Sequence, residues 1–381
     1  MTRKALLVFL GIFIAALLIQ GITWTELRLI DDYMWANQAE YVATGDVQQF
    51  DATRAYGHPG APIIDGTIFV NKIFGLPYFE ALVLFLALSN GLVIGSIAVT
   101  CHILRPKNLW WVPVAGMLAL NRLYEYGSPP SVLAPLLLVL LSLLTLWIYE
   151  NHSRARSIHY FLWGITGGLA TATRADISTL MIAVFLFLLL WKTNLRKVFV
   201  MGATAILTFI TVNPFMWYMP ITHMKDLVEK AAYHYAEFEP YHIPLATVLN
   251  ISSFLIVSMV LSFCFLLLQK KLPQVLPFGF LYALYILTAI VYATFLTAHY
   301  QATRYFLPII FIWETFLPLF LFSLIGEIHL DFLKTQQGQV IARRWMYIII
   351  SALLIGLPLA MFINALLLDY GLFYSSFLYV R

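Results

Sequence analysis

The chain has 381 residues, of which 61% are hydrophobic and 11% are charged, whereas an ordinary soluble domain is about 25% charged. Most of the chain therefore needs a non-aqueous solvent, which excludes an ordinary soluble enzyme and predicts an all-α integral membrane protein. The net charge of +4 does not indicate a nucleic-acid partner, because the basic residues fall in short loops between apolar runs, as membrane topology requires.

The first apolar run covers residues 5–23 and follows Arg3 and Lys4. A span needs about 20 residues, so this run is long enough to cross a bilayer. No small-x-small cleavage site followed by a polar segment comes after it, so we expect an uncleaved anchor rather than a signal peptide. Cys101 and Cys264 lie in separate apolar runs, without metal-ligand spacing or a disulfide framework.

Residues 24–76 follow this span as a first extracytoplasmic loop and contain two stretches with the apolar spacing of helices. One begins at "DDYMWANQAEYVATG" and the other at "HPGAPIIDGTIFVNKIFG". The spacing predicts two interfacial helices that lie along the membrane surface. An adjacent carboxylate pair, Asp31 and Asp32, stands where the chain leaves the membrane.

Further apolar runs bring the expected number of transmembrane helices to about eleven. They lie near 77–104, 109–121, 129–149, 159–173, 175–191, 198–217, 245–268, 275–298, 304–325 and 345–367. Residues 214–244 form a second large extracytoplasmic loop. No soluble domain or repeat interrupts the pattern, so we predict a single membrane domain over residues 1–381.

The charges predict the orientation. With the N-terminus in the cytoplasm, about 14 of the 23 basic residues fall in cytoplasmic loops, which is the positive-inside pattern. About 15 of the 19 acids fall on the opposite side. Acids contribute little to orientation during insertion, so their accumulation indicates a use for carboxylates on the extracytoplasmic face. The expected location is a bacterial inner or plasma membrane.

The order of parts, an acidic pair after the first span and then two interfacial helices, resembles the GT-C superfamily of membrane glycosyltransferases. The resemblance is to the branch of protein O-mannosyltransferases and lipid A aminoarabinose transferases. "LIDDYMWANQAEYVATGD" looks like the branch's acidic pair, and "YGHPGAPIIDGTIFVNKIFG" looks like its Lys or His followed by prolines. "ATATRADIST" and "ATRYFLPII" are similar to later stretches that open spans from the outer side.

The chain departs from this pattern in three ways. Gly60 stands where a second proline is usual after His58, the acidic pair is Asp-Asp rather than the common Asp-Glu, and no large soluble C-terminal domain follows.

The resemblance implies a polyprenyl-phosphate-linked sugar as donor and a hydroxyl acceptor on a lipid, glycan or protein. Inverting transfer needs a base for the acceptor proton, and a carboxylate at the water interface can be that base, so the predicted catalytic residue is Asp31 or Asp32. The leaving lipid phosphate needs cations or N–H groups at headgroup depth. His58, Arg174 and Arg304 are the predicted donor-phosphate residues.

Additional substrate contacts are expected beside Arg304. They are His299, Tyr300, Gln301 and Tyr305. The resemblance implies no required metal cofactor, while two adjacent carboxylates leave binding of Mg²⁺ or Mn²⁺ open.

Plainer interpretations exist for several of these residues. Asp31 could be the N-cap of a helix whose first turn holds Asp32. His58 could be an ordinary loop residue. Arg174 could extend to the membrane surface in a pair with Asp176.

At the level of function, the main alternative is a transporter or flippase of a lipid-linked or polar substrate. A non-catalytic membrane subunit is a second alternative. Glu314 lies about 15 Å into its predicted span, near mid-membrane, and is the residue that most favours a transporter.

Overall fold

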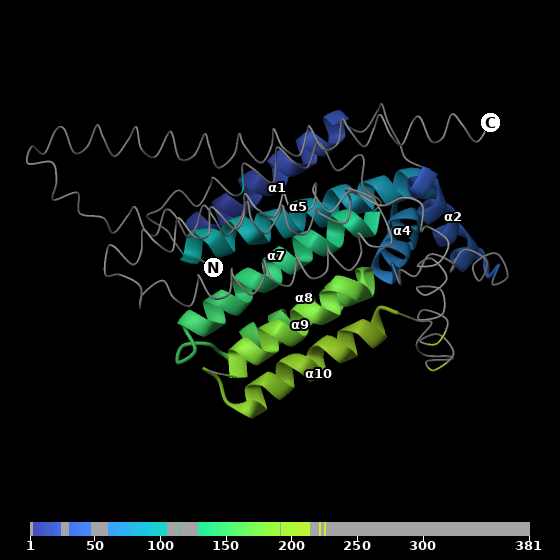
Figure 1. Ribbon diagram of the computed structural model, residues 1–381. Helices are drawn as coiled ribbons and strands as arrows, with labels where there is room; N and C mark the ends of the chain where they lie inside the picture. The colour runs from blue at the N-terminus through green and yellow to red at the C-terminus, as the bar shows by residue number, and fades with distance from the viewer. Residues whose placement is uncertain are drawn as a thin grey trace, which may run out of the picture.

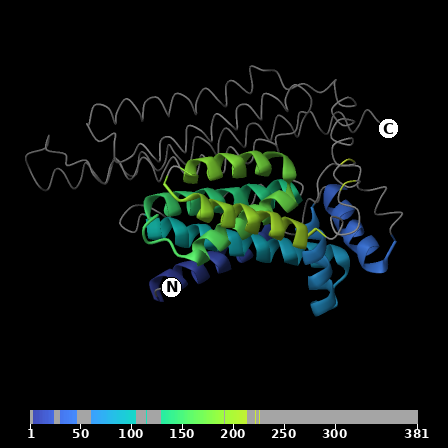
Figure 2. The same ribbon diagram turned by 90° about the horizontal axis from the view of Figure 1, so that it is seen from below.

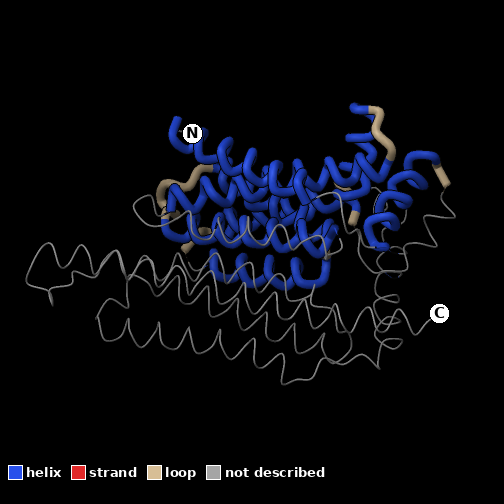
Figure 3. The backbone as a smooth tube through the Cα atoms, turned by 90° about the horizontal axis from the view of Figure 1, so that it is seen from above, coloured by secondary structure: helices blue, strands red, loops and turns tan. Residues whose placement is uncertain are grey.

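The computed structural model describes residues 3–23, 30–46, 60–104, 129–190 and 192–213, with the single positions 114, 221 and 225. These ranges contain eight helices and no strand (Figures 1 and 3). The helices are α1 (Arg3–Thr23), α2 (Ile30–Thr44), α4 (Ala61–Phe74), α5 (Tyr78–Leu104), α7 (Pro129–Glu150), α8 (Ser157–Thr173), α9 (Ala175–Leu190) and α10 (Leu195–Thr211). The predicted all-helical fold is confirmed for this part of the chain.

The longer helices form a row in the order α1, α5, α7, α8 and α10, and α9 lies against α7, α8 and α10. Helices α2 and α4 pack against each other and against α5 at one end of this row (Figures 1 and 2). We call this the α2–α4 end. The N-terminus lies at the opposite end.

Two helical segments in the described ranges are long and apolar enough to cross a bilayer, Tyr78–Leu104 and Leu133–Glu150. The first has 27 residues, a length of about 40 Å at 1.5 Å per residue. Helices α1, α5, α7, α8, α9 and α10 fall on predicted apolar runs. The run 109–121, the runs beyond 245 and most of the loop 214–244 lie outside the described residues.

Helix α10 is shifted toward the N-terminus relative to the predicted run 198–217. It begins at Leu195 because the Asn194 side chain accepts a hydrogen bond from the Lys197 N–H at 3.0 Å and so caps the helix. It ends at Thr211, since a proline at position 214 disfavours helical backbone in the residue before it.

Glycines allow α1 and α5 to approach closely. A Cβ added at Gly91 would lie 3.0 Å from the Phe13 ring, and one at Gly95 would lie 3.0 Å from the Phe9 ring. The two phenylalanines are stacked, with ring centroids 6.0 Å apart. The numbers of the contacting residues rise along α5 as they fall along α1, so the two helices are antiparallel.

A second pair of glycines brings α8 against the backbone of α10. A Cβ at Gly164 would lie 2.8 Å from the Met201 carbonyl oxygen, and one at Gly168 would lie 2.5 Å from that of Ala205. The numbers of the contacting residues rise along both helices, so α8 and α10 run parallel. Small residues at this spacing are typical of helix pairs that pack in membranes.

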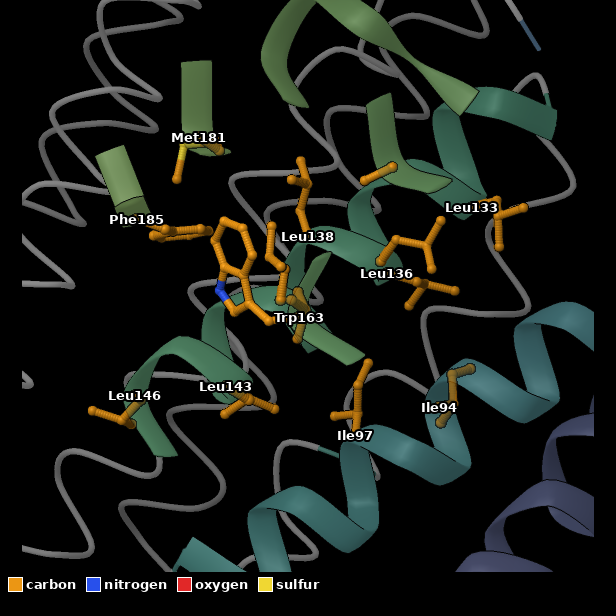
Figure 4. Close-up of a cluster of buried hydrophobic side chains, with 14 of the residues drawn as sticks. Ile94, Ile97, Leu133, Leu136, Leu138, Leu143, Leu146, Trp163, Met181 and Phe185 are labelled. Atoms are coloured by element: carbon orange, nitrogen blue, oxygen red, sulfur yellow. The ribbon is translucent and has the colours of Figure 1, made fainter. Parts of the chain in front are cut away.

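Trp163 lies at the centre of the core formed by α7, α8 and α9 (Figure 4). Its indole N–H donates to Thr145 Oγ1 at 2.7 Å, and Met181 and Phe185 of α9 lie beside its ring. An unpaired N–H in such apolar surroundings would cost about 1–3 kcal/mol, so this hydrogen bond fixes α8 against α7.

Basic residues gather at the end opposite α2 and α4. They are Arg3, Lys4, Arg154, Arg156, Lys192, Arg196 and Lys197. The Lys192 and Lys197 ammonium groups lie 5.5 and 5.3 Å from the ring centroids of Tyr149 and Tyr160. The α2–α4 end instead carries Glu40, Asp46, Asp65 and Glu80. Glu150 at one end, and Lys72 and Arg174 at the other, are exceptions. The charge asymmetry expected from the sequence otherwise follows the long axis of the described bundle.

Candidate functional site

The first predicted interfacial helix is α2, and its two faces differ. The face toward the bundle carries buried side chains, which are Trp35, Ala36, Gln38 and Ala39. The outward face carries exposed Tyr33, Asn37 and Glu40. Helix α2 thus has a buried and an exposed face, but its apolar residues are not concentrated on one of them, and its location along the membrane surface stays a prediction.

Asp31 and Asp32 belong to the first turn of α2, because the helix begins at Ile30. The backbone of Asp31 is therefore already helical, which contradicts the N-cap interpretation. Position 31 lies one helical turn before Trp35, and position 32 lies one turn before Ala36, so by register both positions belong to the bundle-facing half of α2. The placement of the two carboxylates lies outside the described residues.

Gly60 controls the entry into α4, the second predicted interfacial helix. Its φ of 52° is left-handed, and a Cβ on it would overlap the Trp35 ring. Proline requires a φ near −65°, so the proline usual at this position in the resembled family could not be accommodated here. Pro62 instead lies in the first turn of α4, where its missing N–H costs no hydrogen bond.

Asp65 of α4 is a candidate that the sequence pattern did not single out. Burial raises its pKa from 3.8 to about 6. A carboxyl group with a pKa near neutrality can exchange a proton under working conditions, which acid–base catalysis requires. The sequence feature that could have indicated Asp65 is its position as a lone acid within the apolar stretch "APIIDGTIF".

Arg174 is the single residue between α8 and α9, and its N–H donates to the Ala170 carbonyl at 2.8 Å. Its side chain is 0% exposed. The protein therefore encloses the guanidinium, which contradicts the interpretation that the side chain extends to the surface. The Asp176 side chain lies outside the described residues, so its pairing with Arg174 stays a prediction. A buried cation requires polar or anionic partners. Because α8 ends beside α4, Arg174 lies at the α2–α4 end (Figure 1).

Asn213 follows the C-cap of α10 and is also 0% exposed. Neither atom of its side-chain amide has a hydrogen-bond partner among the described residues. The Asn-Pro dipeptide was visible in the sequence as a turn signal. The burial of the amide was not visible, because it depends on how α10 packs.

A groove of about 520 Å³ lies between the outward face of α2 and the turn from α4 to α5. Its lining includes Tyr33, Asn37, Glu40, Asn71, Tyr78 and Phe79. The Tyr33 and Phe79 rings are stacked at 4.6 Å, and the Asn71 amide donates to the Leu76 carbonyl at 2.7 Å. Aromatic rings with a carboxylate and amides can bind hydroxyl-rich or ammonium groups. By register, positions 31 and 32 lie on the other side of α2.

The described residues thus bring Arg174 and the first turn of α2 to one end of the bundle. The other predicted site residues lie outside the described part of the chain, namely His58, His299, Tyr300, Gln301, Arg304 and Tyr305, as does Glu314. Within the described ranges, no three His, Cys, Asp or Glu side chains gather as a metal site would require.

No family model matches the chain, and neither the curated proteins nor the solved structures contain a significant match to it. The function therefore has to be argued from the residues and their arrangement.

Proposed function

We propose that the protein is an inverting membrane glycosyltransferase that moves a sugar from a polyprenyl-phosphate donor to an acceptor hydroxyl on a lipid, glycan or protein. One observation carries this proposal. The register of α2 assigns Asp31 and Asp32 to its bundle-facing half, at the end where Arg174 is enclosed.

The proposed reaction uses one carboxylate of the pair as general base. It takes the proton of the acceptor hydroxyl as that oxygen attacks the anomeric carbon, and the bond from this carbon to the phosphate oxygen breaks. Arg174 offsets the negative charge on the departing lipid phosphate, with His58 and Arg304 as further proposed contacts. The first turn of a helix keeps a carboxylate ionised, which a base requires.

The proposal includes a membrane with about eleven spans, a cytoplasmic N-terminus and an extracytoplasmic site. Helix α10 supports it by exposing Leu195, Phe199, Ile206 and Leu207, each 61–74% exposed. Soluble proteins rarely present such a continuous apolar face to water. The basic residues at the opposite end support the cytoplasmic assignment of that end.

Helix α4 fits a location in the headgroup layer. It exposes Phe69, Ile73 and Phe74, each more than half exposed, beside exposed Lys72. An apolar surface next to a cation is typical of a helix that lies in the interface rather than across the bilayer.

Transport of a lipid-linked or polar substrate is the second candidate, and Asn90 favours it. Asn90 lies inside the long apolar helix α5, is 1% exposed, and its Oδ1 has no partner among the described residues. Polar groups at membrane depth often mark a substrate pathway.

The test is sugar transfer in vesicles that contain the purified protein, supplied with polyprenyl phosphates carrying mannose, glucose, galactose or aminoarabinose. Asp31→Asn and Asp32→Asn are made singly, and Asp46→Asn, at an exposed position just after α2, is the matched control. At least one Asp variant should lose roughly 10²-fold or more of the activity, as expected when a general base is removed. The control should remain active.

Full activity in both Asp variants would remove the catalytic role proposed for the pair. Movement of the intact lipid-linked sugar across the vesicle membrane, without transfer to any acceptor, would favour the transporter instead.

A further inference from the structure

The parallel packing of α8 and α10 brings Asn213 to the same end of the bundle as Arg174. Gly164 lies beside Met201 and Thr204, and Gly168 lies beside Ala205 and Thr208. Arg174 follows the last residue of α8, and Asn213 follows the C-cap of α10. Two fully buried polar residues thus lie at the same end of two helices whose backbones are in direct contact.

The neighbouring polar groups at this end already have hydrogen-bond partners. Thr173 Oγ1 donates to the Leu169 carbonyl at 2.7 Å, and Ser178 Oγ donates to the Ala170 carbonyl at 3.0 Å. The backbone N–H of Asn213 donates to the Ile210 carbonyl at 3.2 Å. The Asn213 side chain differs from these groups, because both its donor and its acceptor are buried without a partner among the described residues.

A buried, unpaired amide destabilises a fold, and such groups call for an explanation in a native structure. A ligand that pairs with this amide must offer both a hydrogen-bond acceptor and a donor. The ionised phosphate of the lipid offers acceptors only, whereas a sugar attached to it adds hydroxyl donors. Arg174, enclosed at the same end of the bundle, favours a negative charge on such a ligand.

We propose that Asn213 binds the glycosyl phosphate head of the donor together with Arg174, with its amide donating to a phosphate oxygen and accepting from a sugar hydroxyl. This inference rests on the proposed function and deepens it, because it makes Asn213 a residue that distinguishes a sugar-bearing lipid phosphate from a bare one. Asn213 has no part in moving the proton, so it is a binding residue.

The test measures binding, independently of turnover, with polyprenyl phosphate and with the same lipid carrying each sugar of the panel. The readouts are the affinity of the purified full chain for each lipid and the thermal unfolding midpoint without ligand. Asn213→Leu keeps the approximate volume but removes both hydrogen-bonding groups. Ser142→Ala is the control, because it removes a buried polar group from the middle of α7 instead.

The wild type should bind one sugar-bearing lipid more tightly than bare polyprenyl phosphate. Asn213→Leu should lose about 10-fold or more of the affinity for that lipid and most of the preference, as expected for a hydrogen bond to a charged group. Its unfolding midpoint should not fall, since no native hydrogen bond is lost. Ser142→Ala should keep the wild-type preference.

Asn213→Asp provides a second variant of nearly the same shape. It loses the N–H donor and places a carboxylate near the phosphate, so it should weaken binding of both lipids. Unchanged affinity in Asn213→Leu, or failure of both variants to fold, would overturn the inference.

The outcomes also separate this inference from the proposed function. The wild type could bind the sugar-bearing lipid with the Asn213-dependent preference and yet transfer no sugar. That result would support the inference and contradict the proposed transferase activity. A wild-type protein that binds none of the lipids would remove both.

Discussion

Asp65 makes the stability of the fold depend on pH at the level of one residue. Burial raises its pKa to about 6 from 3.8, so the folded protein retains a proton that the unfolded chain releases at lower pH. The free energy of unfolding should therefore fall as the pH rises from about 4 to about 6, and level off above that range.

Asp65→Asn should remove most of this fall, because the amide does not titrate. The measurement is the thermal unfolding midpoint in detergent across the same pH range. Glu80→Gln, at the same end of the bundle, keeps Asp65 and should keep the slope. A slope that persists in Asp65→Asn would assign the pH dependence to another group.

Gly60 and Gly45 form a natural pair for separating backbone strain from steric overlap. Both have positive φ, 52° and 80°, so alanine at either position costs roughly 1–2 kcal/mol. A Cβ at Gly45 meets nothing within 4 Å, whereas one at Gly60 overlaps the Trp35 ring. Gly60→Ala should therefore destabilise the protein by about 1–3 kcal/mol more than Gly45→Ala, the usual cost of overpacking.

The comparison uses the free energy of unfolding of each variant, measured by denaturant titration in mixed micelles. Equal losses in the two variants would show that Trp35 does not press on the turn before α4. The expected difference would confirm that the first turn of α4 is held against α2 by this contact.

At the scale of the helix, the contact between α8 and α10 depends on having no side chain at Gly168. A Cβ there would lie 2.5 Å from the Ala205 carbonyl oxygen, and that backbone atom cannot rotate away. Gly168→Ala should separate the helices and destabilise the protein by about 1–3 kcal/mol, despite the gain in helix propensity.

Gly11→Ala is the control within a helix, since a Cβ on Gly11 of α1 meets nothing within 4 Å. It should be neutral or stabilise by up to about 1 kcal/mol. Thermal unfolding midpoints of the two variants test the difference. A Gly168→Ala protein as stable as Gly11→Ala would contradict the close approach of the two helices.

At the scale of the whole molecule, charged residues gather at the two ends of the described bundle, and exposed apolar residues lie along its sides. Basic residues gather at the end opposite α2 and α4, and acids gather at the α2–α4 end. The sides of α1, α8 and α10 expose large apolar residues such as Leu7, Phe161 and Phe199. A lipid layer around the sides and water at both ends would satisfy this arrangement.

The helix positions were predictable from the sequence because they depend on neighbours along the chain. Apolar runs indicated α1, α5, α7, α8, α9 and α10, and apolar spacing indicated the two shorter helices α2 and α4. The ends of α10 were displaced from the prediction by a cap at Asn194 and a proline after Asn213, both local effects that a hydropathy pattern does not register.

The sequence by itself determined the helical class, the order of the helices and the separation of charge, since each follows from hydrogen bonding and solvation within short segments. Only the tertiary structure decided that Arg174 and Asn213 are enclosed, that the pKa of Asp65 is raised, and that position 60 must be glycine. The physical reason is that burial and close approach depend on which distant residues pack against a position. Trp35 against Gly60, and α10 against α8, are contacts between segments that no local pattern connects.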